Sequence, residues 1–395
     1  MMFEIIGNVF PIIRNGANIK QDKVTDGYPI TRIETIADGT VDLNRVGYAS
    51  INDESFSDFY LKENDILMSH INSVSHLGKV ALVNGIEKKV IHGMNLLCLK
   101  ADENKINPEY SYYFFKSPEF RSKIKRITKK SVNQASFNIS NLKNIEIPLP
   151  PLPDQLHIAS ILSKAENLIA QRKESICLLD DFLKSTFLEM FGDPVRNERG
   201  WDIGKFKDLA VLDRKQVLPS EFTNEDFYIG LEDIEKETGN IIKTSSENAE
   251  DLKSSKFRFT PNHILYAKLR PYLNKVALPS QAGICSTDIF PVLPLQEKSN
   301  RFFICYLMRS KPFVTEMHSK SSGANLPRAS ASVIENFKTY QPPIELQTQF
   351  AQIVEKTEAI KTQYQQSLQE LENLYGSLSK KAFKGELSVK QEVVQ

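Results

Sequence analysis

The segment PPLPDQLHIASIL, Pro150–Leu162, returns in altered form as PPIELQTQFAQIV at Pro342–Val354. The two copies are offset by 192 positions, and the correspondence continues without a gap to Phe191 and Phe383. Few residues are identical, but most apolar positions of the first copy are apolar in the second. A period this long indicates duplicated domains, because solenoid repeats are only about 20–50 residues long.

Weaker echoes of the repeat precede both copies. NDILMSHI at Asn64–Ile71 resembles NHILYAKL at Asn262–Leu269, and GKVALV at Gly78–Val83 resembles NKVALP at Asn274–Pro279. The offset between these echoes drifts by a few residues, as loop insertions would cause. The chain therefore reads as domain, helix, domain, helix.

Both repeated segments predict long helices. Apolar residues recur about every 3.5 residues in each, with Leu168 and Ile360 among them, which is the spacing of a coiled coil. About 35 helical residues would span roughly 50 Å. We expect the two stripes to pack on each other; the alternative is that each docks on its own domain. Arg172 falls on the first stripe, in register with Tyr364, where it could form a pair or extend its charge to solvent.

The segments before the two helices are rich in short β-like runs, such as KVALV in the first and HILYAKL in the second, and then turn helical. This order of patterns indicates mixed α/β domains, so the predicted fold class is α/β with an internal pseudo-twofold repeat. The expected boundaries are a first domain at 1–152, a first helix at 153–193, a second domain at 194–343, a second helix at 344–385 and a tail at 386–395.

Composition is that of a folded protein, with 41% hydrophobic and 25% charged residues. No run of about 18 apolar residues and no signal-peptide pattern occurs, so we expect a cytoplasmic protein without membrane contact. The four cysteines are far apart, which suits free thiols in a reducing compartment. The net charge of +1 excludes a histone-like excess of positive charge and leaves DNA binding to local clusters.

The sequence predicts no catalytic or metal site in this chain. It has no glycine-rich loop of the phosphate-binding or dinucleotide-binding type, and its histidines lack metal-ligand spacing. The tetrapeptide NPEY at Asn107–Tyr110 is only loosely like an amino-methyltransferase motif and is better explained as a helix start. A nuclease-type pair of acids with a lysine is too loose a pattern to test here.

Basic and amide residues gather ahead of both repeated helices. The segment 116–138 holds seven basic residues against one acid, and a second polar-basic segment spans 317–332. Lysine and arginine neutralise phosphates, and arginine, asparagine and glutamine read base edges. A solvated helix face is the alternative, but recurrence before both helices favours DNA binding. The candidate DNA contacts are Lys123, Lys125, Arg126, Lys129, Lys130 and Gln134 in the first domain, and Lys268, Arg270, Lys320, Asn325 and Arg328 in the second.

The order of these parts resembles the specificity subunits of type I restriction-modification systems. The resemblance rests on IPLPPLPDQLHIASIL, on FGDPVRNERGW at Phe191–Trp201 after the first helix, on SGANLPRASASVIENF at Ser322–Phe337, and on QPPIELQTQFAQIV. It covers essentially the whole chain, and its sharpest element, PPL followed by Gln, fits more loosely in the second copy.

The resemblance implies two target recognition domains, each reading half of a bipartite site in double-stranded DNA. It implies spacer helices that form an antiparallel coiled coil, fix the gap between the half-sites and dock two modification subunits. Restriction and translocase subunits would join the complex. No cofactor is expected in this chain; S-adenosylmethionine, ATP and Mg²⁺ would belong to the partner subunits. That division would explain the missing catalytic residues.

Three other interpretations remain open on the sequence. The chain could serve another type of restriction-modification system, or it could be a coiled-coil scaffold that binds proteins through both domains. It could also be a self-sufficient methyltransferase. A scaffold should show no steep dependence of DNA affinity on salt concentration.

Overall fold

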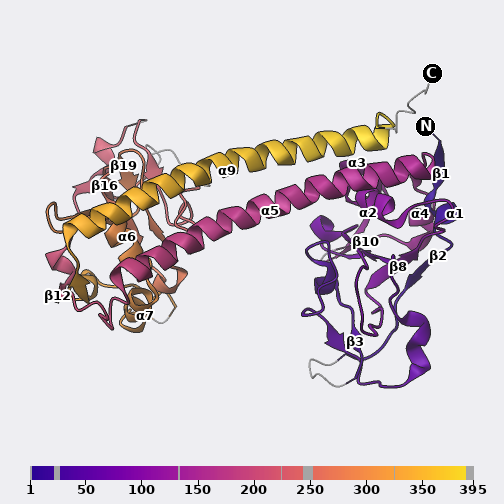
Figure 1. The fold of residues 1–395 in the computed structure, drawn as a ribbon, viewed down its shortest axis with the longest axis horizontal. Coiled ribbons are helices and arrows are strands. Elements are labelled where there is room, and N and C mark those ends of the chain that lie inside the picture. The colour runs from indigo at the N-terminus through magenta and orange to yellow at the C-terminus, as the bar shows by residue number, and fades with distance from the viewer. Residues whose placement is uncertain are drawn as a thin grey trace. The chain divides into compact units, whose positions relative to one another are not determined.

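The computed structural model describes residues 2–21, 27–131, 134–223, 225–242, 252–323 and 325–387. The chain divides into two compact units: unit 1 comprises Met1–Gln171 with Ser367–Gln395, and unit 2 comprises Arg172–Gln366. Helix α5 (Leu152–Phe191) and helix α9 (Ile344–Lys384) each contribute one half to each unit (Figure 1). Most of the expected tail, residues 388–395, lies outside the described residues, and the domain boundaries stay predictions.

Unit 1 is built on a four-stranded antiparallel sheet in the order β2-β8-β5-β7. Its strands are β2 (Ile12–Asn15), β8 (Leu96–Lys100), β5 (Ile66–Ser69) and β7 (Val80–Leu82). Two shorter pairs are β1 (Phe3–Ile5) with β11 (Glu146–Pro148) and β3 (Pro29–Ile30) with β4 (Gly47–Tyr48). A small three-stranded sheet has the order β6 (Ile71–Asn72), β10 (Ala135–Ser136) and β9 (Lys129–Lys130). The helices are α1 (Ile6–Val9), α2 (Pro108–Lys116), α3 (Pro118–Ile127) and α4 (Ile139–Lys143).

Unit 2 repeats this plan with a four-stranded antiparallel sheet in the order β13-β20-β17-β18. Its strands are β13 (Ala210–Leu212), β20 (Ile289–Pro294), β17 (Ile264–Ala267) and β18 (Val276–Ala277). Strand β12 (Asp202–Lys205) pairs with β21 (Lys338–Gln341), and a second sheet contains β14 (Gln216–Val217), β16 (Lys256–Phe259), β19 (Gly283–Cys285) and β15 (Tyr228–Ile229). The helices are α6 (Arg301–Arg309), α7 (Lys311–Ser319) and α8 (Ala331–Glu335).

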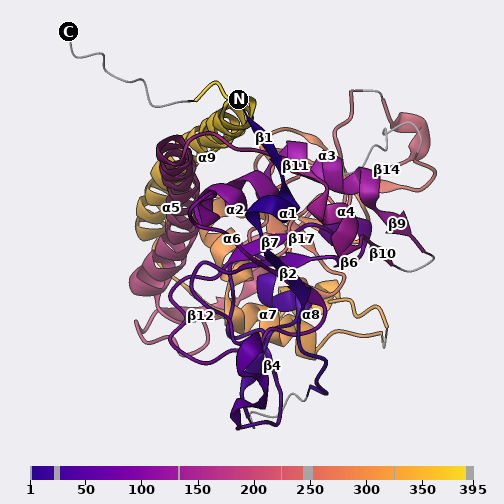
Figure 2. The same ribbon diagram turned by 90° about the vertical axis from the view of Figure 1, so that its right-hand side faces the viewer.

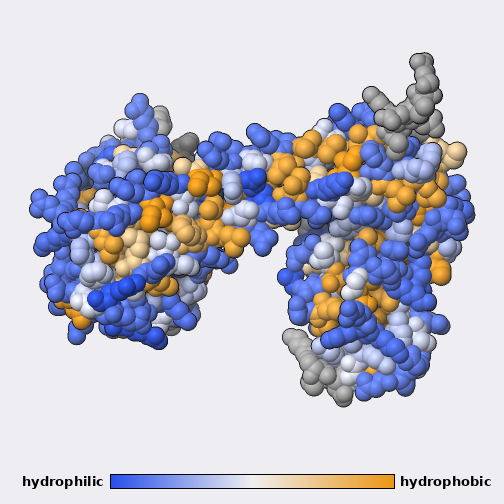
Figure 3. Space-filling view, viewed as in Figure 1, coloured by the Kyte–Doolittle hydropathy of each residue, from blue (hydrophilic) through white to orange (hydrophobic). Residues whose placement is uncertain are grey.

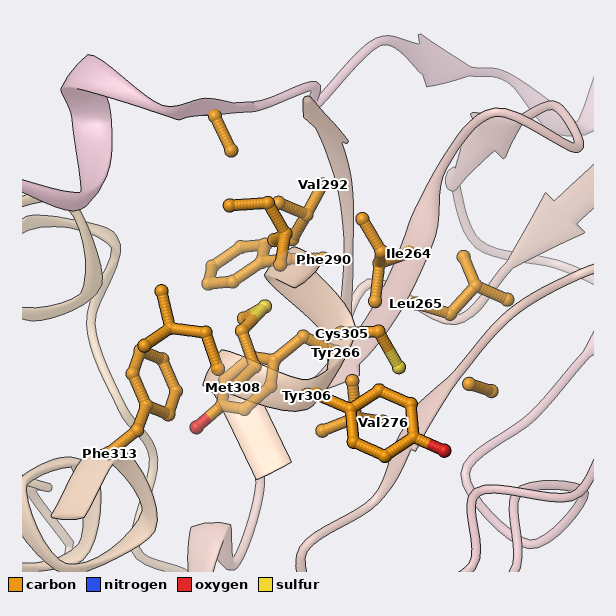
Figure 4. Close-up of a cluster of buried hydrophobic side chains, with 14 of the residues drawn as sticks. Ile264, Leu265, Tyr266, Val276, Phe290, Val292, Cys305, Tyr306, Met308 and Phe313 are labelled. Carbon is orange, nitrogen blue, oxygen red and sulfur yellow. The ribbon is translucent and has the colours of Figure 1, made fainter. Parts of the chain in front are cut away.

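The two central sheets share strand order and polarity, and each is followed in the chain by a pair of helices. In unit 2, side chains from β17, β20 and α6 point toward one another in the core, among them Tyr266, Phe290 and Cys305 (Figure 4). The predicted class, two mixed α/β domains with an internal repeat, is confirmed.

The glutamine of the repeated motif locks each long helix to its own domain. Gln155 is fully buried; its Oε1 accepts from the Asn107 amide at 2.7 Å, and its Nε2 donates to the carbonyls of Lys105 and Pro150 at 3.1 and 2.8 Å. Gln347 makes the same three bonds in unit 2, to Asn300 at 2.9 Å, Lys298 at 3.1 Å and Pro342 at 2.8 Å. This buried joint explains why the motif occurs twice.

The inner faces of α5 and α9 follow a heptad, in alternating steps of three and four residues. None of the α9 positions on this face is exposed: Phe350, Val354, Thr357, Lys361, Tyr364, Leu368, Leu371, Tyr375, Leu378 and Ala382. The corresponding α5 positions, also buried or half-buried, are Ile158, Leu162, Ala165, Ile169, Arg172, Ile176, Leu179 and Leu183.

In unit 2 the helices pack on each other directly and run antiparallel. Phe187 meets Phe350 with ring centroids 5.5 Å apart, and the Arg172 guanidinium lies 4.2 Å from the Tyr364 ring centroid. Of the two roles that the sequence left open for Arg172, the structure shows the pairing, with Tyr364 as the partner. Between these contacts the Lys361 ammonium, on a side chain that is 6% exposed, binds the Asp180 carboxylate at 2.5 Å.

In unit 1 the first half of α5 and the last turns of α9 share one hydrophobic core. Ile158 and Leu162 from α5 lie in the same buried cluster as Ala382 and Phe383 from α9. Phe383 packs on Tyr110 of α2 at a centroid distance of 5.6 Å. Each helix thus docks on a domain as well as on the other helix, so the two packing modes foreseen from the sequence coexist.

Two residues of the expected stripes do not lie on the packed face. Leu168 is 50% exposed and Ile360 is 42% exposed, whereas their neighbours Ile169 and Lys361 face inward. A strict heptad passes through 169 and 361, so polar Lys361 takes the inner position because Asp180 satisfies its charge.

Candidate nucleic-acid interface

In unit 1 the predicted basic segment forms a small finger that follows α3. We call the described residues 129–131 and 134–136 finger 1. Within it β9 pairs with β10, and β10 pairs with β6 directly after β5 (Figure 2). The Ser131 amide donates to the Gln134 carbonyl at 2.7 Å. Lys129, Lys130 and Gln134 are all exposed, so the structure brings three candidate contacts together.

The three candidate contacts in α3 differ in whether their charged groups are exposed or already paired within unit 1. Lys125 and Arg126 are exposed in the last turn of the helix, just before finger 1. Lys123 instead donates to the Glu146 carbonyl at 2.8 Å and pairs with Glu119 at 3.3 Å, so its charge is engaged within unit 1. Arg126 and Lys129 also line a cleft of about 400 Å³ together with Asn141 and Asn144.

In unit 2 the described residues 322–323 and 325–328 form the corresponding feature, which we call finger 2. The backbone of Arg328 forms isolated β-bridges with both Ser322 and Leu269. Leu269 lies just beyond the end of β17. Asn325 is exposed at the finger, while exposed Lys320 precedes it and pairs with Glu316 at 2.6 Å.

The two fingers occupy equivalent positions in their units. The Phe137 amide donates to the His70 carbonyl at 3.2 Å, and the Ala329 amide donates to the Lys268 carbonyl at 2.9 Å. His70 and Lys268 each stand one residue after the matching strands β5 and β17. The duplication therefore places both predicted basic segments at the same point of the repeated frame, by which we mean the central four-stranded sheet and the helix pair that both units share.

Finger 2 joins three more of the predicted residues. The Arg270 amide donates to the Pro327 carbonyl at 2.7 Å, and Arg270 itself is exposed in a left-handed conformation with φ of 50°. Arg328 and Lys268 both face the Asp288 carboxylate, at 3.0 and 3.8 Å. Hydrogen bonding to Asp288 raises the pKa of Arg328 further above its ordinary value, which keeps the guanidinium charged.

The equivalent place in unit 1 carries no comparable charge. His70 is 6% exposed, and burial lowers the pKa of its imidazole below the ordinary value. Its ring stands edge-on to Phe137 at a centroid distance of 6.4 Å. An uncharged imidazole here and an ammonium at Lys268 give the two fingers different electrostatic surroundings.

The described part of the chain offers no cluster of three or more His, Cys, Asp or Glu side chains that could hold a metal ion. No helix within the described ranges combines the length and apolarity needed to cross a membrane.

Comparison with known proteins identifies the family of this repeated frame. The model of the type I restriction modification DNA specificity domain matches twice, at residues 2–177 and 198–373. A protein assigned as the type I restriction enzyme MjaX specificity subunit of Methanocaldococcus jannaschii is 32% identical over 372 residues, covering 87% of this chain and 83% of its own. The chain belongs to the type I DNA specificity family. It is accordingly a DNA-sequence-recognition subunit of a type I restriction-modification system, as the sequence motifs predict.

Solved structures of the family share the fold. The type I S subunit from M. genitalium has a TM-score of 0.56 at 17% identity, covering 97% of this chain and 96% of its own. A chain from a structural study of complex assembly and conformational transition in a type I system has a TM-score of 0.57 at 14% identity, covering 98% of both chains.

Sequence reasoning missed Asp288, which pairs with the candidate contacts Arg328 and Lys268. It lies 40 positions before Arg328, in a segment with no basic or amide cluster, so no local signal marks it. Pairing of the antiparallel strands around β17 brings the two residues together. Gln155 and Gln347 stood in the repeated motif, but their hydrogen-bonding role depends on backbone groups about 50 positions away.

Proposed function

We propose that each unit reads one half of a bipartite DNA site through its finger. The single observation that carries this proposal is the equivalent placement of two exposed, polar-basic fingers on one repeated frame. Exposed Lys129 and Lys130 can neutralise phosphates, and Gln134, Asn325 and Arg328 carry groups that can bond to base edges. Because the finger residues differ between the units, the two half-sites should differ in sequence.

The paired helices would set the gap between the half-sites and dock two modification subunits. Exposed apolar residues recur at matching positions of the repeat, Leu168 with Ile360 and Phe182 with Leu374, each 42–51% exposed. Hydrophobic surface lies along both helices on the face seen in Figure 3. Such residues serve association with a partner better than they serve the stability of this chain.

Catalysis would belong to the partner subunits. Modification subunits would bind S-adenosylmethionine and transfer its methyl group, and restriction subunits would use ATP and Mg²⁺ for translocation and cleavage. In this scheme the present chain, acting in the cytoplasm, contributes binding, register and spacing. The histidines and cysteines of this chain would take no part in the reaction.

The proposal is tested first by the salt dependence of binding. The complex of this chain with its modification subunits should bind DNA carrying its site, and log Kd should rise steeply with log salt concentration. A protein-binding scaffold would show no such slope. Binding of labelled S-adenosylmethionine to the isolated chain would instead support a self-sufficient methyltransferase.

The decisive test is sequencing of methylated sites in a host that carries this chain and its modification subunits. Wild type should give two short specified segments separated by a fixed unspecified gap. Replacing Lys129, Lys130 and Gln134 together by alanine should weaken or relax one segment and leave the other unchanged. A change in both segments would contradict reading by separate units.

A further inference from the structure

The Arg328 guanidinium is held side-on by a carboxylate. Its Nε lies 3.0 Å from Asp288 Oδ1, and its Nη2 lies 3.2 Å from Asp288 Oδ2. This is the two-point pairing that arginine makes with carboxylates and lysine cannot. The Arg328 side chain is nevertheless 42% exposed, while Asp288 is 25% exposed.

The pairing leaves the far edge of the guanidinium available. Of its five N–H donors, two serve Asp288, and both Nη1 hydrogens and one on Nη2 remain. Within the described residues Nη1 reaches the Leu326 carbonyl at 3.4 Å, a long and weak contact. The Nη1–Nη2 edge is the one that donates two parallel hydrogen bonds to O6 and N7 of guanine in the major groove.

The surroundings keep this edge positive and in one orientation. The Lys268 ammonium lies 3.8 Å from the same carboxylate, so Asp288 faces two cations and the cluster of three carries a net positive charge. The backbone of Arg328 is fixed on both sides, because its amide and carbonyl both bond to Ser322, at 2.9 and 3.1 Å. Fixing the side chain before binding lowers the entropy cost of a two-point contact.

We propose that Arg328 reads a guanine by a bidentate contact and that Asp288 is the residue that positions it. This rests on the proposed function of unit 2 as the reader of one half-site. In unit 1 the equivalent positions are Ser136 and Asn95, which offer no guanidinium and no carboxylate. The two half-sites therefore differ at this point, and the required guanine belongs to unit 2.

The test compares Arg328→Ala, Arg328→Lys and Asp288→Asn in the full chain, each with its modification subunits, by sequencing methylated sites in the host. Wild type should require guanine at one position of the segment read by unit 2. Both Arg328 variants should lose about 10-fold or more of the preference for guanine there and leave all other positions intact. Asp288→Asn should relax the same position less. Arg196→Lys, an exposed arginine of the linker, is the matched control.

The alternative roles of Arg328 give different results. A phosphate contact would weaken binding at all sites equally and leave the motif unchanged, which would overturn the proposal. A structural ion pair would lower the thermal midpoint in all three variants without changing the motif, which would overturn it too. Arg328→Lys keeps the charge, so relaxation in a variant that unfolds at the wild-type temperature supports base reading. If wild type shows no segment attributable to unit 2, the proposed function itself fails.

Discussion

Units 1 and 2 share the same frame of strands and helices, but the exposed side chains that this frame carries differ between them. Gln155 and Gln347 make the same three hydrogen bonds, and the fingers leave matching strands. Finger 1 carries two exposed lysines and a glutamine, while finger 2 carries an arginine fixed by a carboxylate. Positions that satisfy buried backbone groups have few alternatives, whereas exposed positions are free to vary. The residues that would recognise DNA can therefore change while the fold that carries them stays the same.

The same contrast appears inside the cores. His92 of unit 1 bonds to the carbonyl four residues ahead, that of Leu96, at 2.9 Å, and Cys285 of unit 2 makes the matching bond to Ile289 at 3.8 Å. Each precedes the strand that lies next to β5 or β17. The geometry is common to both units, but only the imidazole can gain a proton in mild acid.

Removing the buried glutamine should produce the largest effect and should do so equally in both units. Gln155→Ala and Gln347→Ala each leave one backbone amide and two carbonyls without their partner. We expect each to lower the free energy of unfolding by about 4 kcal/mol. Denaturant unfolding measures the loss, and the exposed Gln352→Ala on α9 should change it by less than about 0.5 kcal/mol.

Fluorescence separates the two units in that experiment. Trp201 is the only tryptophan of the chain and lies in unit 2, so its transition reports that unit. Gln347→Ala should shift the tryptophan transition strongly. A clearly smaller loss for one glutamine than for the other would break the equivalence of the two joints.

Lowering the pH should destabilise unit 1 through His92, which is 1% exposed and has a cysteine, Cys285, as its counterpart in unit 2. Burial lowers the pKa of its imidazole to about 4, while the unfolded chain takes up this proton near pH 6.5. The contribution of the neutral imidazole is therefore complete above pH 6.5 and is lost as pH falls toward 4, by about 3 kcal/mol. The stability difference between wild type and His92→Cys should shrink by that amount over this range. The exposed His157→Gln should show no such change, and a pH-independent difference for His92→Cys would contradict the burial argument.

The ion pair between the helices should matter only in unit 2. Asp180→Ala leaves the buried Lys361 ammonium without its carboxylate partner. We expect the free energy of unfolding to fall by about 2 kcal/mol, a moderate loss because Asp180 is 28% exposed. Lys361→Ile introduces the residue found at the matching position 169 of unit 1 and should be neutral or stabilising. Thermal unfolding followed at Trp201 measures both. If Lys361→Ile lowered the free energy of unfolding as much as Asp180→Ala does, the ion pair would be a net source of stability, which would contradict this prediction.

The lysines of finger 1 should have the smallest effect. Lys129→Ala with Lys130→Ala should weaken DNA binding by the modification complex similarly for all sequences and reduce the salt slope by about one for each phosphate that is no longer neutralised. The matched control is Lys123→Ala, whose ammonium is already engaged by Glu119 and the Glu146 carbonyl and should change the slope less. If wild type, the double variant and Lys123→Ala all had the same dependence of log Kd on log salt concentration, finger 1 would not bind phosphate.

The sequence predicted the parts that depend on local or repeated patterns. The heptads indicated both helices, and short β-like runs followed by a helical pattern indicated the mixed α/β domains. It placed Leu168 and Ile360 on the packed face because apolar character cannot reveal that Lys361 is buried against Asp180. It found Arg328 but not Asp288, because strand pairing that brings distant positions together leaves no mark in either local segment.

The spacing role of the two helices is tested by the methylated motif after one heptad is inserted into each helix, between residues 171 and 172 and between 366 and 367. Seven residues preserve the inner face of the coiled coil and lengthen each helix by about 10 Å, or about three base pairs of DNA. We expect both specified segments to be unchanged and the unspecified gap to be about three base pairs longer. An unchanged gap, or altered bases in either segment, would contradict this expectation.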